Sequence, residues 1–236
     1  MKAEKDREEM HMPGTDNTAG DLPKGASRAT SEQAQAAARE PSTDEQIRAA
    51  YVGEPAPLVG PIQIVDYDPQ WPRLFEREAE RIQAALGDRV LLLEHVGSTS
   101  VPGLAAKPRI DVLLVVADSA AESAYVPALE SAGYVLRIRE PDWYEHRVFK
   151  GSDMDINLHV FSLGCPEIER MLLFRDWVRS NASDRRLYER TKRELARQDW
   201  KYAQNYADAK TAVVEEILTR ARGDGGAEAH EDDYSQ

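Results

Sequence analysis

The sequence predicts an α+β fold in which a mixed sheet is backed by helices. Between residues 90 and 161, short apolar or alternating runs are separated by Gly, Pro and polar residues, which is typical of strands. From Pro166 onward the apolar residues recur at helical spacing. These patterns place the strands in the middle of the chain and most of the helices towards its C-terminal end.

The first predicted elements are a strand and a helix. The run IQIVDY at residues 62–67 alternates as a strand does. The next segment, residues 68–87, predicts an amphipathic helix that ends at Gly87, because apolar side chains recur on one of its faces: Leu74, Phe75, Ala79, Ile82 and Leu86.

The middle of the chain predicts further strands around one helix. VLLLEHVG at residues 90–97 reads as a strand, and RIDVLLVVA at residues 109–117 is so continuously apolar that we expect a strand buried on both faces. The remaining elements expected here are a helix at 120–132 and strands at 134–140, 145–151 and 153–161. The last of these, DMDINLHVF, alternates polar and apolar residues, as a strand with one polar face does.

The C-terminal part predicts three helices, separated at SNASD and near Asp199. They are expected at residues 166–180, 184–197 and 200–221, with apolar stripes that can pack against the sheet.

One domain is expected, at residues 61–222. Residues 1–60 are expected to form a disordered tail and linker, because large apolar residues are few before Tyr51 and GEPAPLVGP breaks both helix and strand patterns. A short capped helix near Thr43 is not expected to join the core. Residues 223–236 hold five acidic and no basic residues and are expected to be a disordered acidic tail.

Composition excludes several classes of protein. The formal net charge of −12 argues against binding duplex nucleic acid, which requires clustered basic residues. The single cysteine, Cys165, has no partner for an intramolecular disulfide or a zinc site. No stretch is long and apolar enough to span a membrane, and no secretion signal is visible. We therefore expect a soluble, cytoplasmic protein with no membrane partner.

The stretch HVGSTSVPGLAAKPRIDV at residues 95–112 carries the main chemical signal. The Gly97-Ser98 turn closes one predicted strand, and Asp111 lies inside the next. Such a turn lets backbone amides and a hydroxyl approach a triphosphate, while the carboxylate can hold Mg²⁺ or Mn²⁺. A purely structural turn followed by a strand-edge aspartate is the alternative.

Two neighbouring groups extend this candidate site. On DMDINLHVF, Asp155 and His159 share a face and are expected to hold metal with Asp111, unless that face is merely solvated. His95 is a candidate base or ligand, or else a core histidine. Asp111, His95 and His159 are thus the predicted catalytic residues.

The predicted phosphate and nucleotide contacts come from both halves of the domain. In the first half, Thr99 either contacts phosphate or caps the turn, and Lys107 either meets phosphate or is solvated. In the helical half, Arg175, Tyr206 and Lys210 are candidates, and the last two lie four residues apart on one helical face. If this face closes over the site, Lys210 binds the outer phosphates and Tyr206 stacks on a base or sugar; otherwise both lie on the surface.

The same stretch resembles the signature of the GrpB family, also called UPF0157. Further similar segments are NLHVF, CPEIERMLLFRDWVRS, YERTKREL and YADAKTAVVEEI, so the resemblance covers about residues 62–218. It implies a polymerase-β-like nucleotidyltransferase fold, in which a mixed sheet carries the Gly-Ser turn and the metal-binding carboxylates, and C-terminal helices face the nucleotide. His95 resembles the family's histidine at this place.

One departure from the wider superfamily bears on the reaction. That superfamily usually places a second carboxylate two positions after the first, but Leu113 occupies this position here. Two hypotheses follow. One is metal-dependent nucleotidyl transfer from a nucleoside triphosphate to a small-molecule or protein acceptor that the sequence does not identify. The other is a non-catalytic module that binds a nucleotide or a CoA-related ligand, since GrpB-like domains are found fused to dephospho-CoA kinase.

Overall fold

A computed structural model describes residues 40–227, so most of the tails predicted at 1–60 and 223–236 lies outside the described residues. The centre of the structure is a five-stranded sheet of order β1-β2-β5-β4-β3. Strands β2 and β5 are parallel, and the other neighbours are antiparallel, so the predicted mixed sheet is confirmed. The strands are β1 (Leu92–Val96), β2 (Ile110–Val116), β3 (Tyr134–Glu140), β4 (His146–Gly151) and β5 (Ile156–Ser162).

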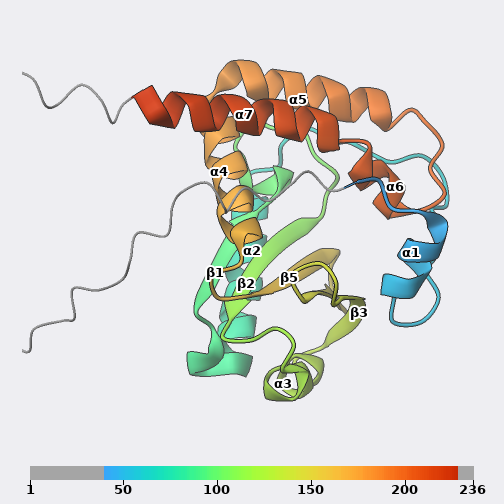
Figure 1. Cartoon of the computed structure of the whole chain (residues 1–236), viewed down its shortest axis with the longest axis vertical. Helices are drawn as coiled ribbons and strands as arrows, with labels where there is room; N and C mark the ends of the chain where they lie inside the picture. The colour runs from blue at the N-terminus through green and yellow to red at the C-terminus, as the bar shows by residue number, and fades with distance from the viewer. Residues whose placement is uncertain (1–39, 228–236) are drawn as a thin grey trace, which may run out of the picture. The chain divides into compact units, whose positions relative to one another are not determined.

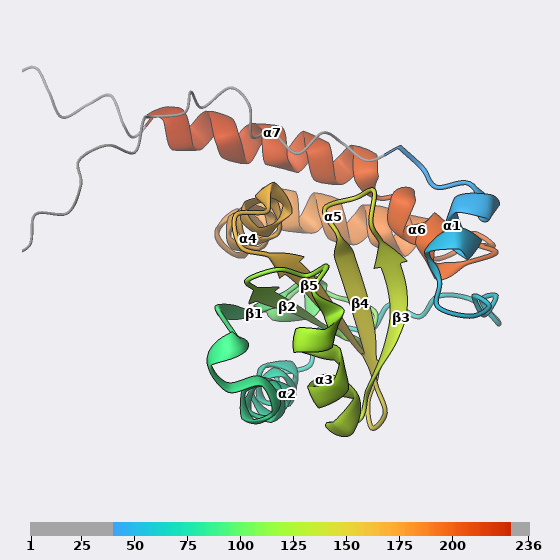
Figure 2. The same cartoon turned by 60° about the horizontal axis from the view of Figure 1, so that its bottom comes forward.

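Helices cover both faces of this sheet. Helix α2 (Trp71–Leu86) and the short α3 (Val126–Ser131) lie on one side, as Figures 1 and 2 show. The other side carries α4 (Pro166–Ser180), α5 (Ala182–Leu195), α6 (Ala203–Asp208) and α7 (Thr211–Ala227). The described residues also form three short 3₁₀ helices: η1 (Gly87–Arg89), η2 (Ser98–Ser100) and η3 (Glu122–Ala124).

Strand β2 shows why its sequence is almost continuously apolar. Val112 and Leu114 pack into the core that includes Ile82 of α2, whereas Leu113 and Val115 pack with residues of α4. Because successive side chains point to opposite faces of a sheet, a strand covered on both sides needs apolar residues at nearly every position.

Three predicted elements differ in the structure. Residues 62–67 form only an isolated bridge, Val65 to Ala106, instead of a strand. The helix expected at 120–132 divides into η3 and α3, with a proline in the first turn of α3. The single helix expected at 200–221 divides into α6 and α7, because the chain turns at Ala209 and Lys210.

The segment before the predicted domain is built into the fold. Helix α1 (Asp44–Ala50) begins with a capping box in which the Thr43 side chain accepts from the Gln46 amide, and Ile47 is buried. Tyr51 then forms a bridge with Ile138 of β3. The sequence assigned these residues to a tail and linker, since so short a helix buries its apolar side chains only when the rest of the fold supplies the partner surface.

At the other end, α7 continues to Ala227, past Arg222 where the sequence analysis ended the domain. Within residues 40–227, none of the helices is both long and apolar enough to cross a membrane.

Candidate functional site

A cavity of about 870 Å³ lies beside the sheet, on the face that also carries α4. Side chains from β2, β3, β4 and β5 line it, together with the η2 turn and residues from α4, α5 and α6. Residues 51–59, which precede the predicted domain, also contribute to its wall. A volume of this size suits a ligand as large as a cofactor or nucleotide.

The floor of the cavity follows from strand alternation. Asp111 of β2 lies beside Asn157 of β5, and His159 lies opposite Val148 of β4. Lys150 pairs with Asn157 in the same register. These residues lie at alternate positions of their strands, so their side chains point to the same face of the sheet. The apolar residues between them enter the core on the other face.

Gly97 brings the η2 turn against Asp111. It adopts φ +68°, and a Cβ placed on it would lie 2.5 Å from Asp111 Oδ2. Both the left-handed backbone and this close approach require glycine. Gly97 and Ser98 therefore line the cavity next to the carboxylate, as the motif predicted.

Asp111 is held by neutral and basic neighbours. Asn157 donates through Nδ2 to Asp111 Oδ1 at 2.7 Å, and His159 Nε2 lies 3.8 Å from the same oxygen. Burial alone would raise the pKa of Asp111, but contacts with His159, the Asn157 amide and the charge of Arg109 together hold it below its ordinary value. The side chain is therefore an ionised acceptor at neutral pH.

A chain of polar groups leads from Asp111 across the sheet. His146 Nε2 lies 3.1 Å from His159 Nδ1, and His146 Nδ1 lies 2.7 Å from a carboxylate oxygen of Glu140. The two imidazoles are nearly parallel, and Phe161 stacks on His146 with ring centroids 4.4 Å apart. These contacts fix the orientation of His159. Sequence analysis missed Glu140 and His146, although both alternate onto this face.

The predicted metal set is only partly assembled. Asp155 lies just before β5 and pairs with Arg109 at 2.6 Å and with Lys150 at 3.7 Å. No group of three His, Cys, Asp or Glu side chains within residues 40–227 is placed to share a metal ion. Asp111 and His159 are close together and Asp155 is neutralised elsewhere, so these residues do not fit a complete two-metal centre. Dependence on Mg²⁺ or Mn²⁺ stays a prediction.

Three lysines line the cavity without a carboxylate partner among the described residues: Lys107, Lys192 and Lys210. Lys192 donates to the Ala105 carbonyl and lies over the Tyr188 ring. Burial and the nearby charge of Lys210 lower the pKa of Lys192 to about 7, and burial likewise lowers the pKa of Lys107. The three lysines thus gather basic groups at one cavity, and none of them forms an ion pair with a carboxylate within residues 40–227. Lys192 was not singled out from the sequence, because its neighbours are typical of a solvated helix.

Two other predicted residues, Tyr206 and Lys210, come from the helical half of the domain, and their contact with a nucleotide stays a prediction. Lys210 Nζ lies 4.8 Å from the centre of the Tyr206 ring, and both side chains line the cavity. The expectation that these two residues face the candidate site agrees with the structure. Lys150, also in the cavity, contacts the Asn157 side-chain oxygen, and burial lowers the pKa of Lys150 to about 8.

His95 and Thr99 support the cavity from behind. His95 has the opposite parity to the cavity residues and stacks on Phe75 of α2, with ring centroids 4.8 Å apart. His95 Nε2 lies 3.1 Å from Thr99 Oγ1, which donates to the Arg109 carbonyl. Burial lowers the pKa of His95 to about 4, so the ring is neutral at pH 7. Thr99 is at the wall, whereas His95 does not line the cavity and occupies the core position that was its alternative.

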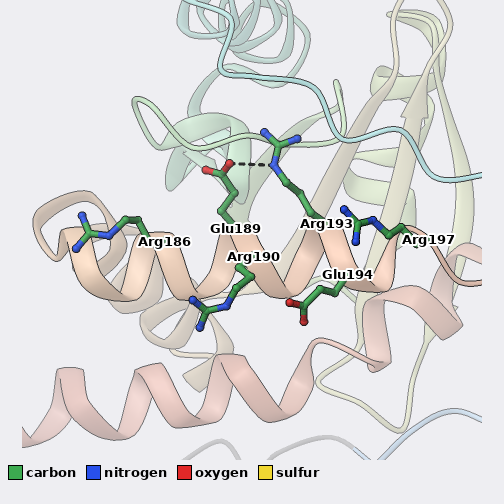
Figure 3. A pocket seen from close by; sticks show the side chains of 6 residues that line it. All are labelled: Arg186, Glu189, Arg190, Arg193, Glu194 and Arg197. Atoms are coloured by element: carbon green, nitrogen blue, oxygen red, sulfur yellow. Dashed lines mark hydrogen bonds and ion pairs between the residues drawn. The ribbon is translucent and has the colours of Figure 1, made fainter.

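Arg175 also lies outside the cavity lining. Its guanidinium contacts Glu94 at 2.6 Å, Asp176 at 2.7 Å and the His95 carbonyl at 3.1 Å. With these partners Arg175 joins α4 to β1. Figure 3 shows a separate hollow along α5, where basic and acidic side chains alternate and Glu189 pairs with Arg193 at 3.0 Å.

Comparisons with known proteins agree with this architecture. A family model described as GrpB protein matches residues 61–220. A UPF0157 protein of Halalkalibacterium halodurans is 62% identical over 181 residues, which cover 77% of this chain and 93% of that protein. A dephospho-CoA kinase of Mycolicibacterium paratuberculosis is 32% identical over 181 residues, which cover 66% of this chain and 44% of the kinase. The crystal structure of conserved protein GrpB from Enterococcus faecalis gives a TM-score of 0.60 at 31% identity and covers 67% of this chain and 96% of that one. The chain therefore belongs to the GrpB family.

Proposed function

We propose that the cavity binds a phosphorylated small molecule, either a nucleoside phosphate or a CoA-related compound. The observation that carries this proposal is the group of Lys107, Lys192 and Lys210, which line one cavity without carboxylate partners among the described residues. Lys192 is buried and the other two are partly exposed, and removing an ion from water without pairing it costs several kcal/mol. A phosphate group supplies the missing negative charge and several acceptor oxygens.

The acidic side chains around the cavity do not replace such a ligand. Asp111 accepts from Asn157, and Glu140 contacts His146. Glu167 is paired with Arg170 at 2.9 Å. None of these carboxylates forms an ion pair with Lys107, Lys192 or Lys210, so the lysines are available to an incoming anion, and the Gly97-Ser98 turn lines the same cavity.

The dephospho-CoA kinase relative supports including CoA compounds among the candidates. The similar part covers less than half of that kinase, so the kinase contains additional sequence. A domain that binds a CoA-related ligand is a suitable companion for an enzyme whose name refers to dephospho-CoA. In this chain a CoA-related ligand could likewise be bound without being converted.

Metal-dependent nucleotidyl transfer is the second candidate function. It is supported by the close packing of Asp111 against Gly97 and by the position of His159 beside Asp111. Asp111 and His159 would hold Mg²⁺ or Mn²⁺ together with phosphate oxygens, and the metal would neutralise charge on the phosphates. Leu113 and the paired Asp155 weigh against a complete two-metal site, so ligand binding is the better supported function.

A binding experiment tests the proposal. Calorimetric titration of the full chain with ATP, GTP, CTP, UTP, CoA and dephospho-CoA, each with and without Mg²⁺ or Mn²⁺, identifies the ligand class. Lys210→Ala is expected to weaken the tightest ligand by about tenfold, since a charge-assisted hydrogen bond contributes about 1.5 kcal/mol. Arg190→Ala removes one positive charge from the outer hollow of α5 and should leave affinity unchanged.

Three outcomes are informative. Failure of every compound to bind at millimolar concentration refutes the proposal. Equal losses in the two variants would mean that only net charge matters and that the cavity is not the site. Turnover of a triphosphate that requires the metal and is lost in Asp111→Asn would favour nucleotidyl transfer.

A further inference from the structure

His159 stands at the end of a hydrogen-bonded chain of three side chains. Its Nδ1 lies 3.1 Å from His146 Nε2, and His146 Nδ1 lies 2.7 Å from Glu140 Oε2. The side chains of Glu140 and His146 are 11% and 6% exposed, whereas that of His159 is 22% exposed and lines the cavity. The chain therefore leads from two largely buried groups to an imidazole that a ligand can reach.

The contact between the two imidazoles is an edge-to-edge hydrogen bond. The ring planes differ by only 6°, and the ring centroids are 5.3 Å apart. This separation exceeds the distance between the two nitrogens by about two ring radii, so Nε2 of His146 points directly at Nδ1 of His159. Phe161 stacks on His146 and holds that ring in place. The aligned hydrogen bond fixes which edge of His159 faces the cavity.

Proton accounting along this chain fixes the tautomer of His159. An ionised carboxylate can only accept, so Glu140 takes the proton on Nδ1 of His146. A neutral imidazole carries a single ring proton, so Nε2 of His146 accepts and Nδ1 of His159 donates to it. Nε2 of the neutral His159 ring is therefore left without a proton.

Nε2 of His159 and the carboxylate of Asp111 form a pair of acceptors in the cavity. Nε2 lies 3.8 Å from Asp111 Oδ1, which is too far for a hydrogen bond. Among the described residues only the Tyr206 hydroxyl is both buried and without a partner, so Nε2 of His159 is open to the cavity. Two neighbouring acceptors repel each other unless donors lie between or beside them.

A ligand that offers two adjacent donors matches this pair. The vicinal 2′ and 3′ hydroxyls of a ribose are such donors, and in dinucleotide-binding folds a carboxylate accepts from a ribose hydroxyl. Both ligand classes proposed for the cavity contain a ribose. In nucleoside triphosphates and in dephospho-CoA both of these hydroxyls are free, whereas in CoA the 3′ position carries a phosphate.

We propose that Nε2 of His159 and the carboxylate of Asp111 accept hydrogen bonds from the two vicinal ribose hydroxyls of a phosphorylated ligand. Glu140 and His146 are positioning residues, which keep Nε2 of His159 unprotonated and directed at the ligand. The lysines of the same cavity take the phosphates. This inference rests on the proposed phosphate binding and identifies the part of the ligand that lies beside Asp111.

The binding test compares ligands that differ only in these hydroxyls. Calorimetry of the full chain, in EDTA without added metal, measures the tightest binder among ATP, GTP, CTP and UTP and its 2′,3′-dideoxy analogue. The ribonucleotide should bind at least about tenfold more tightly, because the analogue loses two hydrogen bonds, one of them to a charged group. If only CoA compounds bind, dephospho-CoA should bind more tightly than CoA, although it has one phosphate fewer.

Two variants assign this preference to His159. His159→Phe should weaken the ribonucleotide by at least about fivefold and leave the dideoxy analogue unchanged, because only the ribonucleotide uses Nε2. Lys210→Ala is the matched control. It should weaken both ligands by the same factor, because they carry the same phosphates.

Nitrogen NMR tests the two positioning residues directly. Two-bond proton–nitrogen spectra of the ¹⁵N-labelled chain at about pH 8, where histidine is ordinarily neutral, report which ring nitrogen carries the proton. His146 and His159 should both be protonated at Nδ1. In His146→Phe the proton of His159 should move to Nε2 and turn to Asp111, and the preference for the ribonucleotide should fall by at least about threefold. Phe161→Leu removes the stacked ring but no hydrogen bond and should leave the tautomer of His159 unchanged.

Four outcomes would overturn the ribose site while leaving phosphate binding intact. These are equal binding of the ribonucleotide and its dideoxy analogue, CoA binding at least as tightly as dephospho-CoA where only CoA compounds bind, an unchanged preference in His159→Phe, and a proton on Nε2 of His159 in the unmodified chain. A preference that appears only after Mg²⁺ is added would assign the acceptor pair to a cation and would also overturn it. Absence of binding by every compound would refute the proposed phosphate site as well.

Discussion

Lys192 offers the sharpest test of how the cavity is built, because its burial opposes folding. The residue is 2% exposed, and its ammonium group has a carbonyl and an aromatic ring as neighbours but no carboxylate partner among the described residues. Burial and the Lys210 charge lower its pKa from the ordinary 10.5 to about 7. At about 1.4 kcal/mol for each tenfold change in the proton equilibrium, this corresponds to a cost of up to about 5 kcal/mol for the charged form.

The pH dependence has a defined sign. Below pH 7, Lys192 is charged in both the folded and the unfolded chain, so the full cost is present. Between pH 7 and 10.5 the unfolded chain binds more protons than the folded chain, so the free energy of unfolding rises with pH. The contribution of Lys192 should rise by about 1.4 kcal/mol per pH unit in this window.

Lys192→Met is the variant that isolates this effect. Urea unfolding of both proteins between pH 6 and 9 gives the difference in their free energies of unfolding, in which titration of the other groups largely cancels. At pH 6 the variant should be the more stable protein. The unmodified chain should then gain about 2–3 kcal/mol relative to it by pH 9, and the variant should bind the phosphorylated ligand more weakly at pH 7.

Two results would refute this reasoning. A difference that stays constant from pH 6 to pH 9 would mean that Lys192 keeps an ordinary pKa in the folded chain. A variant that is less stable at pH 6 would mean that the contacts with Ala105 and Tyr188 outweigh the cost of burial. Arg190→Met, on the outer face of the same helix, is the control for removal of a charge without burial.

Two further predictions concern the architecture around the site. Gly97→Ala should lower the free energy of unfolding by at least about 1–2 kcal/mol, because Gly97 has a positive φ and Asp111 approaches it closely. It should also weaken ligand binding. Denaturant titration measures the first effect and calorimetry the second, and a substitution without effect would contradict the geometry. Glu122→Ala should lower the free energy of unfolding by about 2–3 kcal/mol in denaturant titrations, because Glu122 pairs with both Arg139 and the buried Arg147. Ligand affinity should be unchanged, since none of these side chains lines the cavity. A loss of affinity without a loss of stability in this variant would show that the far side of the sheet influences the site.

The sequence was informative wherever a feature depends on neighbouring residues. The apolar run of β2 indicated a strand covered on both faces, and the helical spacing in residues 68–87 predicted α2, which the structure places at Trp71–Leu86. The meeting of Gly97 with Asp111 was also visible, because the Gly-Ser turn ends one predicted strand and Asp111 lies near the start of the next, which pairs with it. These features arise from periodicity and backbone sterics, which short segments carry in themselves.

Strand ends and parities limited what could be predicted about the site. Asp155 seemed to share a face with His159, but β5 begins only at Ile156, and Asp155 pairs instead with Arg109. His95 occupies a position of β1 whose side chain points away from the cavity, so it faces α2. A one-residue difference in where a strand begins or which way it faces changes which side of the sheet a side chain enters.

The sequence by itself determined the sheet-and-helix class, the order of the main elements and the turn that meets Asp111. Only the tertiary structure decided that residues 51–59 contribute to the cavity wall, that Lys192 is buried beside the cavity and that the Tyr206 hydroxyl has no hydrogen-bond partner among the described residues. Each of these depends on contacts between segments far apart in the chain, such as Leu58 with Lys201 or α5 with the loop at Ala105. Burial and the pairing of charges are properties of such long-range contacts, and for that reason local patterns predicted the scaffold better than the site.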